Sequence, residues 1–312
     1  MEQRKLIKLG NSSFAIALPK DWVLKSGLKK GDKIFIIPNS HGELMISPEF
    51  KKGNGDKEIF LDFENKKEDE INRELIASYI NGNGIFKIKC DKKNIKFIKK
   101  ILHDLPGLEL IEQNQDELVI KDLTDINSIS ISSIIKRIDN IIRSFFEDIE
   151  LGIKKGKITK NQYNEIRETD KEINKFYFLL WKVMVLGMEN PSTLNTLETD
   201  YPSLVHTWWV GTNLEKIGDN LKRISKIAIN KKLENNNNLL EFFQKIKGNH
   251  IKILNAFYKK DKEIALEIAN NKNELYKECN SVCGDTPLLK NELNSIITHL
   301  HYISKCILYF IK

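Results

Sequence analysis

The hydrophobic and polar residues follow three different patterns along the chain. Over residues 1–50, short alternations of apolar and polar residues between glycine-containing turns predict β-strands. Over residues 58–125, strand and helix patterns succeed one another in the order β-α-β-α-β-β, which predicts a small α/β sandwich. Over residues 126–312 only helical periodicity is present. The sequence therefore predicts a multidomain protein, with a linker rich in glycine and charge at Lys51–Lys57.

The helical region is predicted to form two bundles of three helices. The expected helices cover residues 127–156, 160–188, 203–232, 239–258, 261–281 and 287–311. An asparagine run at residues 235–238 divides them into halves, 126–234 and 239–312. The halves resemble a repeat, because Thr212–Lys226 and Thr298–Lys312 keep Thr, Leu and Ile in step. Two three-helix bundles in tandem are the simplest arrangement.

The charge distribution is more informative than the total charge. The 312 residues carry 50 Lys and Arg against 43 Asp and Glu, a net charge of +7, which by itself identifies no partner. The first 33 residues hold eight basic and three acidic side chains. Most of the positive excess therefore lies at the N-terminal end, where it bears on a partner such as nucleic acid.

The sequence favours a reduced, cytoplasmic protein that does not insert into membranes. Its four cysteines are too few and too scattered for a disulfide framework. The opening residues have no apolar core of a signal peptide. The most apolar run, Phe176–Met188, is interrupted by Lys182 and is shorter than the roughly 18 residues of a membrane span.

The first 50 residues predict a unit that completes its core by dimerising. Strands are expected over residues 3–9, 13–18, 33–38 and 43–48, with a short helix over Pro19–Gly27. So short a segment rarely buries enough apolar surface to be stable alone, and it contains no cysteine that could form a stabilising disulfide bond. A second copy of the chain is the expected source of the missing core.

This segment resembles the AbrB/MazE (SpoVT-AbrB) swapped-hairpin family. The resemblance rests on K-x-G-N-S-S from Lys8, then L-P-K-x-W from Leu18 and G-L-x-x-G-D from Gly27. It implies an intertwined dimeric barrel that binds double-stranded DNA through the first strand and the G-N-S turn. The resemblance implies that the DNA-binding residues of this sequence are Arg4, Lys5, Lys8, Asn11, Ser12, Ser13 and Lys20.

The chemistry of these side chains suits DNA. Lysine and arginine neutralise phosphates and release counterions, and Ser and Asn contact the backbone or base edges. The alternative is that the charges are only solvated and the barrel serves to dimerise the protein.

Three carboxylates lie on or beside the apolar stripes of two predicted helices. Asp170 falls on the stripe between Ile166 and Ile173, where a carboxylate is costly unless it is paired or bound to a cation. Glu215 and Asp219 flank the next helix's stripe on one side, four residues apart. Such like charges repel mildly, and a metal ion would convert this repulsion into attraction. Oxygen ligands on facing helices are a common way to build a metal site in a bundle.

The spacing is equally compatible with ion pairs. Lys216, Lys222 and Arg223 are near in sequence, and Asp219 with Arg223 forms a favourable pair four residues apart. The carboxylates alone therefore leave open whether their partner is a metal ion or a basic side chain.

The segments Arg167–Lys182 and Asn213–Asn220 resemble the PhoU phosphate-signalling family, in which D-x-x-x-D and E-x-x-x-D on successive helices bind metal ions. The resemblance covers residues 126–312, and archaeal-type members also carry an AbrB-like N-terminus and a small α/β segment. It implies a divalent or trivalent ion such as Mg, Fe or Zn. The implied ligands are Asp170, Asn174, Glu215 and Asp219.

The chain departs from that family at several positions. Asn174 replaces the second aspartate of the first motif, and Asn220 replaces a histidine that usually follows the second. In the second half, His301 and Lys305 occupy the positions of the E-x-x-x-D acids. At most one metal site is therefore expected.

Other chemistry-bearing residues favour structural roles. Cys279 and Cys283, four residues apart, could share a soft metal but are more typical of semi-buried thiols. His299 and His301 point to different helix faces, so they do not form a chelating pair. Trp208 and Trp209 are expected to be core or packing residues rather than a platform for a ligand.

The patterns together predict a non-enzymatic regulator. The sequence shows no glycine-rich phosphate loop, Ser-His-Asp order or Cys-His nucleophile, so no catalytic residue is expected. The two resemblances imply a DNA-binding homodimer that regulates phosphate uptake negatively. They also imply the ATP-binding subunit of a phosphate transporter as a partner. The alternatives are an interaction protein that docks on a transporter without binding DNA, and a metal-storage or metal-dependent hydrolytic protein.

Overall fold

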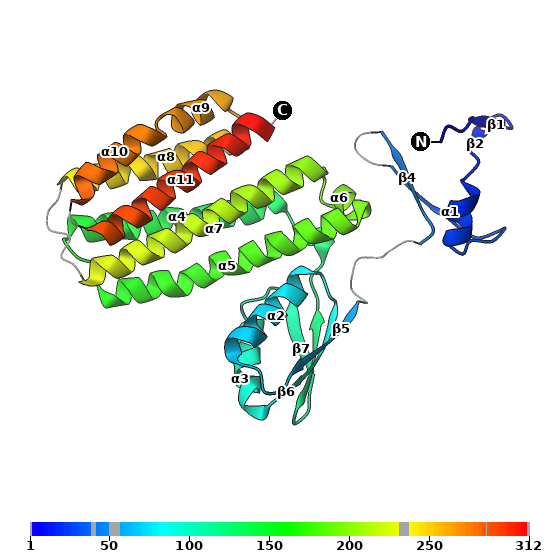
Figure 1. Cartoon of the computed structure of the whole chain (residues 1–312), viewed down its shortest axis with the longest axis horizontal. Coiled ribbons are helices and arrows are strands. Elements are labelled where there is room, and N and C mark those ends of the chain that lie inside the picture. The colour runs from blue at the N-terminus through cyan, green and yellow to red at the C-terminus, as the bar shows by residue number, and fades with distance from the viewer. Residues whose placement is uncertain (1, 39–41, 50–56, 231–236, 285, 311–312) are drawn as a thin grey trace. The chain divides into compact units, whose positions relative to one another are not determined.

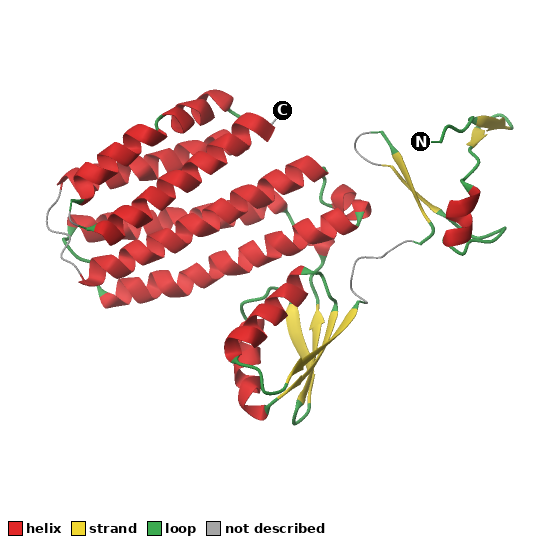
Figure 2. Cartoon of the chain, in the orientation of Figure 1, coloured by secondary structure: helices red, strands yellow, loops and turns green. Residues whose placement is uncertain are grey.

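The computed structural model describes residues 2–38, 42–49, 57–230, 237–284 and 286–310, and these form two compact units (Figures 1 and 2). The first unit is Met1–Lys52 and the second is Gly53–Lys312. The expected linker lies outside the described residues except for its last residue, as do parts of the asparagine run and the ends of the predicted helices 203–232 and 287–311.

The first unit contains two hairpins and a short helix. Strand β1 (Ile7–Leu9) pairs antiparallel with β2 (Ser13–Ala15), and β3 (Phe35–Pro38) pairs antiparallel with β4 (Leu44–Ser47). Helix α1 (Lys20–Lys25) lies between the hairpins in sequence. The predicted strands 3–9 and 13–18 are shorter than expected, because β1 and β2 pair at only three positions. The all-β character of the unit, with one short helix, is confirmed.

The first unit has no buried core of its own. None of its described residues is buried. Its large apolar side chains are instead open to solvent, with Phe14 62% exposed and Leu44 66% exposed. A folded unit normally hides such side chains, so the first unit does not supply enough of its own structure to cover its apolar residues.

The second unit begins with the predicted β-α-β-α-β-β segment. Its elements are β5 (Glu58–Phe63), α2 (Glu68–Ile80), β6 (Ile85–Cys90), α3 (Lys92–Leu102), β7 (Leu108–Gln113) and β8 (Glu117–Asp122). The sheet order is β5-β6-β8-β7, with β5 and β6 parallel and the other pairs antiparallel. The parallel pair requires a crossover connection, which α2 supplies. Alternate residues of β5, such as Leu61 and Phe63, are buried, so one face of the sheet packs on a core.

The helical part of the second unit differs from the prediction at three places. Its elements are η1 (Ile126–Ser128), α4 (Ile131–Lys154), α5 (Lys160–Glu189), α6 (Pro191–Thr196), α7 (Tyr201–Asn230), α8 (Asn237–Lys259), α9 (Lys262–Asn270), α10 (Lys272–Cys283) and α11 (Pro287–Phe310). The predicted helix 127–156 begins at residue 131, because Ser130 caps it by accepting from the Ser133 N–H. The short α6 was not predicted; Asn190 caps it and Pro191 suits its first turn.

The predicted helix 261–281 is two helices. It breaks at Asn271, within an asparagine-rich stretch that favours helix ends over helix interiors. The remaining long helices correspond closely to their predicted ranges.

The long helices share one core. Figure 1 shows α4, α5, α7 and α11 running side by side, and a single cluster of buried apolar residues draws on both predicted halves. Helices α5 and α7 approach each other closely at Gly218, where an added Cβ would lie 2.7 Å from Ile173 Cδ1. Among the described residues, no helix combines the length and apolar character needed to cross a membrane.

The α/β segment is attached to the helical segment through α5. Phe178, Trp181 and Val185 pack against the core of the α/β segment. The buried Lys182 donates hydrogen bonds to Asp122 and Thr124 at the end of that segment. These contacts place both segments in one compact unit, while the predicted domain boundaries 1–50, 58–125 and 126–312 stay predictions.

Candidate functional site

The residues predicted to bind DNA are all exposed in the first unit. Lys8 lies on β1, and Asn11 and Ser12 form the turn that Gly10 opens with a φ of +68°. Ser13 follows on β2, opposite Leu9. The hairpin therefore brings one lysine and three small polar side chains together at its tip.

The other predicted DNA-binding residues flank this hairpin in sequence. Arg4 and Lys5 precede β1, and Lys20 begins α1. The Arg4 guanidinium is already paired with Glu2, at 2.5 Å between Nη2 and Oε2. Arg4 would have to exchange this exposed partner for a phosphate, which costs little because surface ion pairs are weak.

The three predicted acidic metal ligands are paired with lysines of α7 in the second unit. The Lys222 ammonium donates to Asp170 Oδ2 at 2.5 Å and to Asp219 Oδ1 at 2.6 Å. Glu215 Oε2 lies 3.0 Å from Lys216 Nζ, and Arg223 Nη2 lies 3.7 Å from Asp219 Oδ2. The structure thus joins Asp170 of α5 and Asp219 of α7 through Lys222.

The electrostatics of this cluster follow from its partial burial. Burial raises the pKa of Asp170, although the hydrogen bond from Lys222 limits the rise. Burial also raises the pKa of Glu215, and the charge of Asp219 adds to this effect. Burial opposes the charge on Lys222, but its hydrogen bonds to both aspartates raise its pKa, so the ammonium keeps its proton.

These residues, as they are placed, do not fit a metal ion. Within the described ranges, no three His, Cys, Asp or Glu side chains are grouped to hold one. The space between the Asp170 and Asp219 oxygens is taken by the Lys222 ammonium. Asn220 donates to Lys216 O and Ser295 Oγ instead of joining the carboxylates. The predicted ion, with Asn174 among its ligands, stays a prediction.

A buried network between α4 and α8 was not predicted. Asp139 Oδ1 lies 2.8 Å from His250 Nε2, and its Oδ2 accepts from Arg143 Nε at 3.0 Å. Burial opposes the charge of Asp139, but these hydrogen bonds hold its pKa below the usual range. Asp139 shares a helical stripe with Ile135 and Ile142, so the sequence does signal a buried carboxylate. Its histidine partner is 111 residues away and leaves no local signal.

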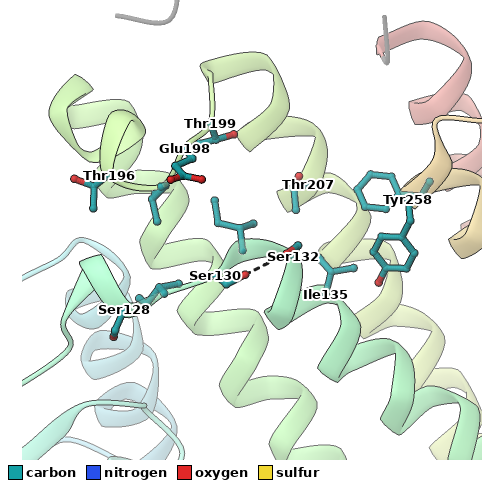
Figure 3. Close-up of a pocket in the computed structure, with 13 residues that line it drawn as sticks. Ser128, Ser130, Ser132, Ile135, Thr196, Glu198, Thr199, Thr207 and Tyr258 are labelled. Carbon is teal, nitrogen blue, oxygen red and sulfur yellow. Dashed lines mark hydrogen bonds between the residues drawn. The ribbon is translucent and has the colours of Figure 1, made fainter. Parts of the chain in front are cut away.

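A cavity of about 600 Å³ near the start of α4 was also not predicted (Figure 3). Glu198 and Thr199, just before α7, and Thr207 of α7 line it together with Tyr258 at the end of α8. Its other described lining residues are Ser128, Ile129, Ser130, Ile131, Ser132, Ile135, Thr196, Leu197 and Phe257. The hydroxyl-bearing residues that line this cavity come from separate segments of the chain, so no single stretch of sequence predicts the cavity.

The other candidate residues, the cysteines, His299 and the tryptophans, make contacts within the protein that suit structural roles. Cys279 and Cys283 are both buried, with their sulfur atoms 3.8 Å apart. His299 Nδ1 lies 3.0 Å from Asn213 Oδ1, and burial lowers the pKa of His299 to about 4. Trp208 packs against the core, and Trp209, although 40% exposed, makes ring contacts with Trp208 and Tyr302, so both are packing residues as predicted.

Comparison with known proteins finds two family models in the chain. Residues 7–54 match the model described as antidote-toxin recognition MazE, bacterial antitoxin, and residues 135–228 match the PhoU domain. Among curated proteins, none is detectably similar in sequence. The solved structure of PhoU from Pseudomonas aeruginosa has a TM-score of 0.47 and 16% identity, covering 58% of this chain and 95% of that chain. The chain therefore joins a MazE-type segment at residues 7–54 to a PhoU-type segment at residues 135–228.

Proposed function

We propose that the protein is a cytoplasmic, homodimeric, DNA-binding regulator of phosphate homeostasis. The observation that carries the proposal is the coreless first unit, which presents both apolar side chains and a basic hairpin tip to solvent. Its match to a MazE antitoxin model supports the same assignment.

The lack of a buried core in the first unit supports dimerisation. An isolated two-stranded hairpin is marginally stable, and this unit consists of two hairpins without a buried residue among those described. Exposed apolar side chains occur on both hairpins, including Ile7 and Phe14 on one and Ile36 and Leu44 on the other. A second copy would cover them, since burying each such side chain stabilises by roughly 1.5–3 kcal/mol.

The charge and shape of the first hairpin support DNA binding. Lys8 and the Asn11-Ser12-Ser13 tip supply one cation and several hydrogen-bonding groups in a small exposed area. A dimer presents this area twice, and Arg4, Lys5 and Lys20 add positive charge beside it. Each phosphate neutralised releases counterions, so binding should weaken steeply as salt increases.

The regulatory role is inferred from the PhoU-type segment. Its resemblance to a phosphate-signalling family supports a sensor that communicates with the ATP-binding subunit of a phosphate transporter and represses phosphate uptake. In this proposal the helical segment biases the DNA affinity of the first unit, which requires two states that differ in that affinity.

The proposal is tested first on DNA. Full-length protein is crosslinked to chromosomal DNA in phosphate-rich and phosphate-starved cells, and the bound fragments are sequenced. Discrete peaks beside phosphate-transport genes, with occupancy that changes with phosphate, are expected. An absence of peaks in both conditions would refute the DNA-binding role and favour an interaction protein whose barrel only dimerises.

A matched pair of variants separates DNA contact from dimerisation. Lys5→Ala/Lys8→Ala removes two charges beside the hairpin tip and should weaken retention of a bound fragment while light scattering still detects a dimer. Lys96→Ala/Lys100→Ala removes two exposed charges from α3 and should leave retention unchanged. Equal loss in both pairs would indicate nonspecific attraction by net charge.

A further inference from the structure

In the acidic cluster of the helical segment, the cation between Asp170 and Asp219 is a side chain of the protein itself, Lys222. Lys222 lies on α7, three residues after Asp219, and its ammonium bridges Asp219 Oδ1 and Asp170 Oδ2 of the facing helix. Both hydrogen bonds are short, as expected for charge-assisted contacts. Lys222 is therefore placed where a metal ion bridging the same two carboxylates would have to be.

Every carboxylate of this cluster already has a basic neighbour. Asp170 and Asp219 share Lys222, and Glu215 is 3.0 Å from Lys216. Arg223 lies 3.7 Å from both Asp219 and Glu292 of α11. The acidic charge is thus opposed by three cations of α7 before any ion is added.

We propose that the Lys222 ammonium replaces a metal ion in this cluster, holding α5 to α7 and excluding metal from the position between Asp170 and Asp219. A metal ion needs oxygen ligands at about 2.0–2.6 Å, so it cannot share this position with an ammonium bonded to the same oxygens. If Lys222 swung aside, its charge would still lie nearby. Repulsion between the Lys222 ammonium and a metal ion about 4 Å away would weaken metal binding on the order of 100-fold or more.

Asn174 is consistent with the same assignment. It lies four residues after Asp170 on α5 and is uncharged, so it adds no negative charge with which to attract a divalent ion. One lysine suffices to bridge the two aspartates. The inference does not depend on the proposed function, because it concerns only α5 and α7.

The test measures metal retention by the full-length protein. Wild-type and Lys222→Ala proteins are stripped with EDTA, incubated separately with Zn²⁺ and Mn²⁺, and dialysed, and bound metal is counted by mass spectrometry. The wild type should retain well under one ion per chain, and its melting temperature should not change with EDTA. Lys222→Ala should retain one ion per chain and melt at a higher temperature with metal than without it.

Controls assign the gained ion to this cluster. Adding Asp170→Asn to Lys222→Ala should abolish retention, whereas Lys252→Ala, which removes an exposed paired lysine from α8, should bind no more metal than the wild type. If Lys222→Ala does not fold, Lys222→Met keeps the apolar stem and replaces it in the assay. The proposal would be overturned if the wild type retained one metal ion per chain and Asp170→Asn removed it. It would also be overturned if a folded Lys222 variant retained no metal.

Discussion

Replacing Lys182 with methionine should destabilise the second unit strongly. Its side chain is 3% exposed, and the side chain of its partner Asp122 is 10% exposed. The ammonium also lies 4.4 Å from the centroid of the Tyr79 ring. Methionine keeps the apolar stem but leaves the Asp122 carboxylate buried without its cation. Breaking a buried pair on one side costs about 3–5 kcal/mol, and we expect a loss of this size.

An exposed ion pair supplies the matched control. Lys87 and Glu58 are 2.6 Å apart on neighbouring strands, but their side chains are 52% and 51% exposed. Lys87→Met should therefore cost about 1 kcal/mol or less. Urea denaturation followed by circular dichroism gives the free energy of unfolding of each variant, and the double variant Lys182→Met/Asp122→Asn completes the comparison.

The double variant distinguishes electrostatics from packing. If the loss in Lys182→Met arises from the uncompensated carboxylate, removing that charge should restore most of the stability. A Lys182→Met protein within 1 kcal/mol of the wild type would refute the reasoning. A double variant as unstable as the single one would show that lost packing around Lys182, and not the buried charge, causes the effect.

Three further predictions concern pH, the buried network and the dimer. Hydrogen bonds from Lys154 and from α8 lower the pKa of Glu150 to about 2, so its stabilising effect is complete above pH 4.5 and is lost as the pH falls toward 2. Glu150→Gln should therefore flatten the acid dependence of the melting temperature, and an unchanged dependence would contradict this. His250→Ala should cost about 3 kcal/mol or more in urea denaturation, because it empties a buried site and removes one partner of Asp139. Ile36→Ser should shift the protein toward monomer in light scattering and leaves the tip of the first hairpin unchanged; an unchanged dimer would contradict the proposal that a second copy covers Ile36.

Local features of the structure could be predicted because they depend on neighbouring residues. Apolar spacing of three and four residues located the long helices, and alternation located the strands of both small segments. The break at Asn271 was missed because the apolar stripe continues across it, so periodicity could not register the interruption.

The partners of charged residues could be predicted only in part. Asp170 could be identified as a carboxylate on a buried stripe, and a cation beside it was expected. The spacing of four residues predicted Arg223 as the partner of Asp219. The closer contact of Asp219 is with Lys222, because the Lys222 side chain also reaches Asp170 on α5. Sequence spacing describes one helix surface and contains no information about the helix that faces it.

The sequence by itself determined the order of the elements, the incomplete core of the first unit and the positions of the acidic residues on their helices. These depend on residue type and on spacing along a single element. Only the tertiary structure decided that Lys222 bridges Asp170 and Asp219, that Lys182 reaches Asp122, and that the serines and threonines around Glu198 line one cavity. Such contacts join residues that are distant in sequence, and they exist only because packing the apolar faces brings particular side chains within reach of one another.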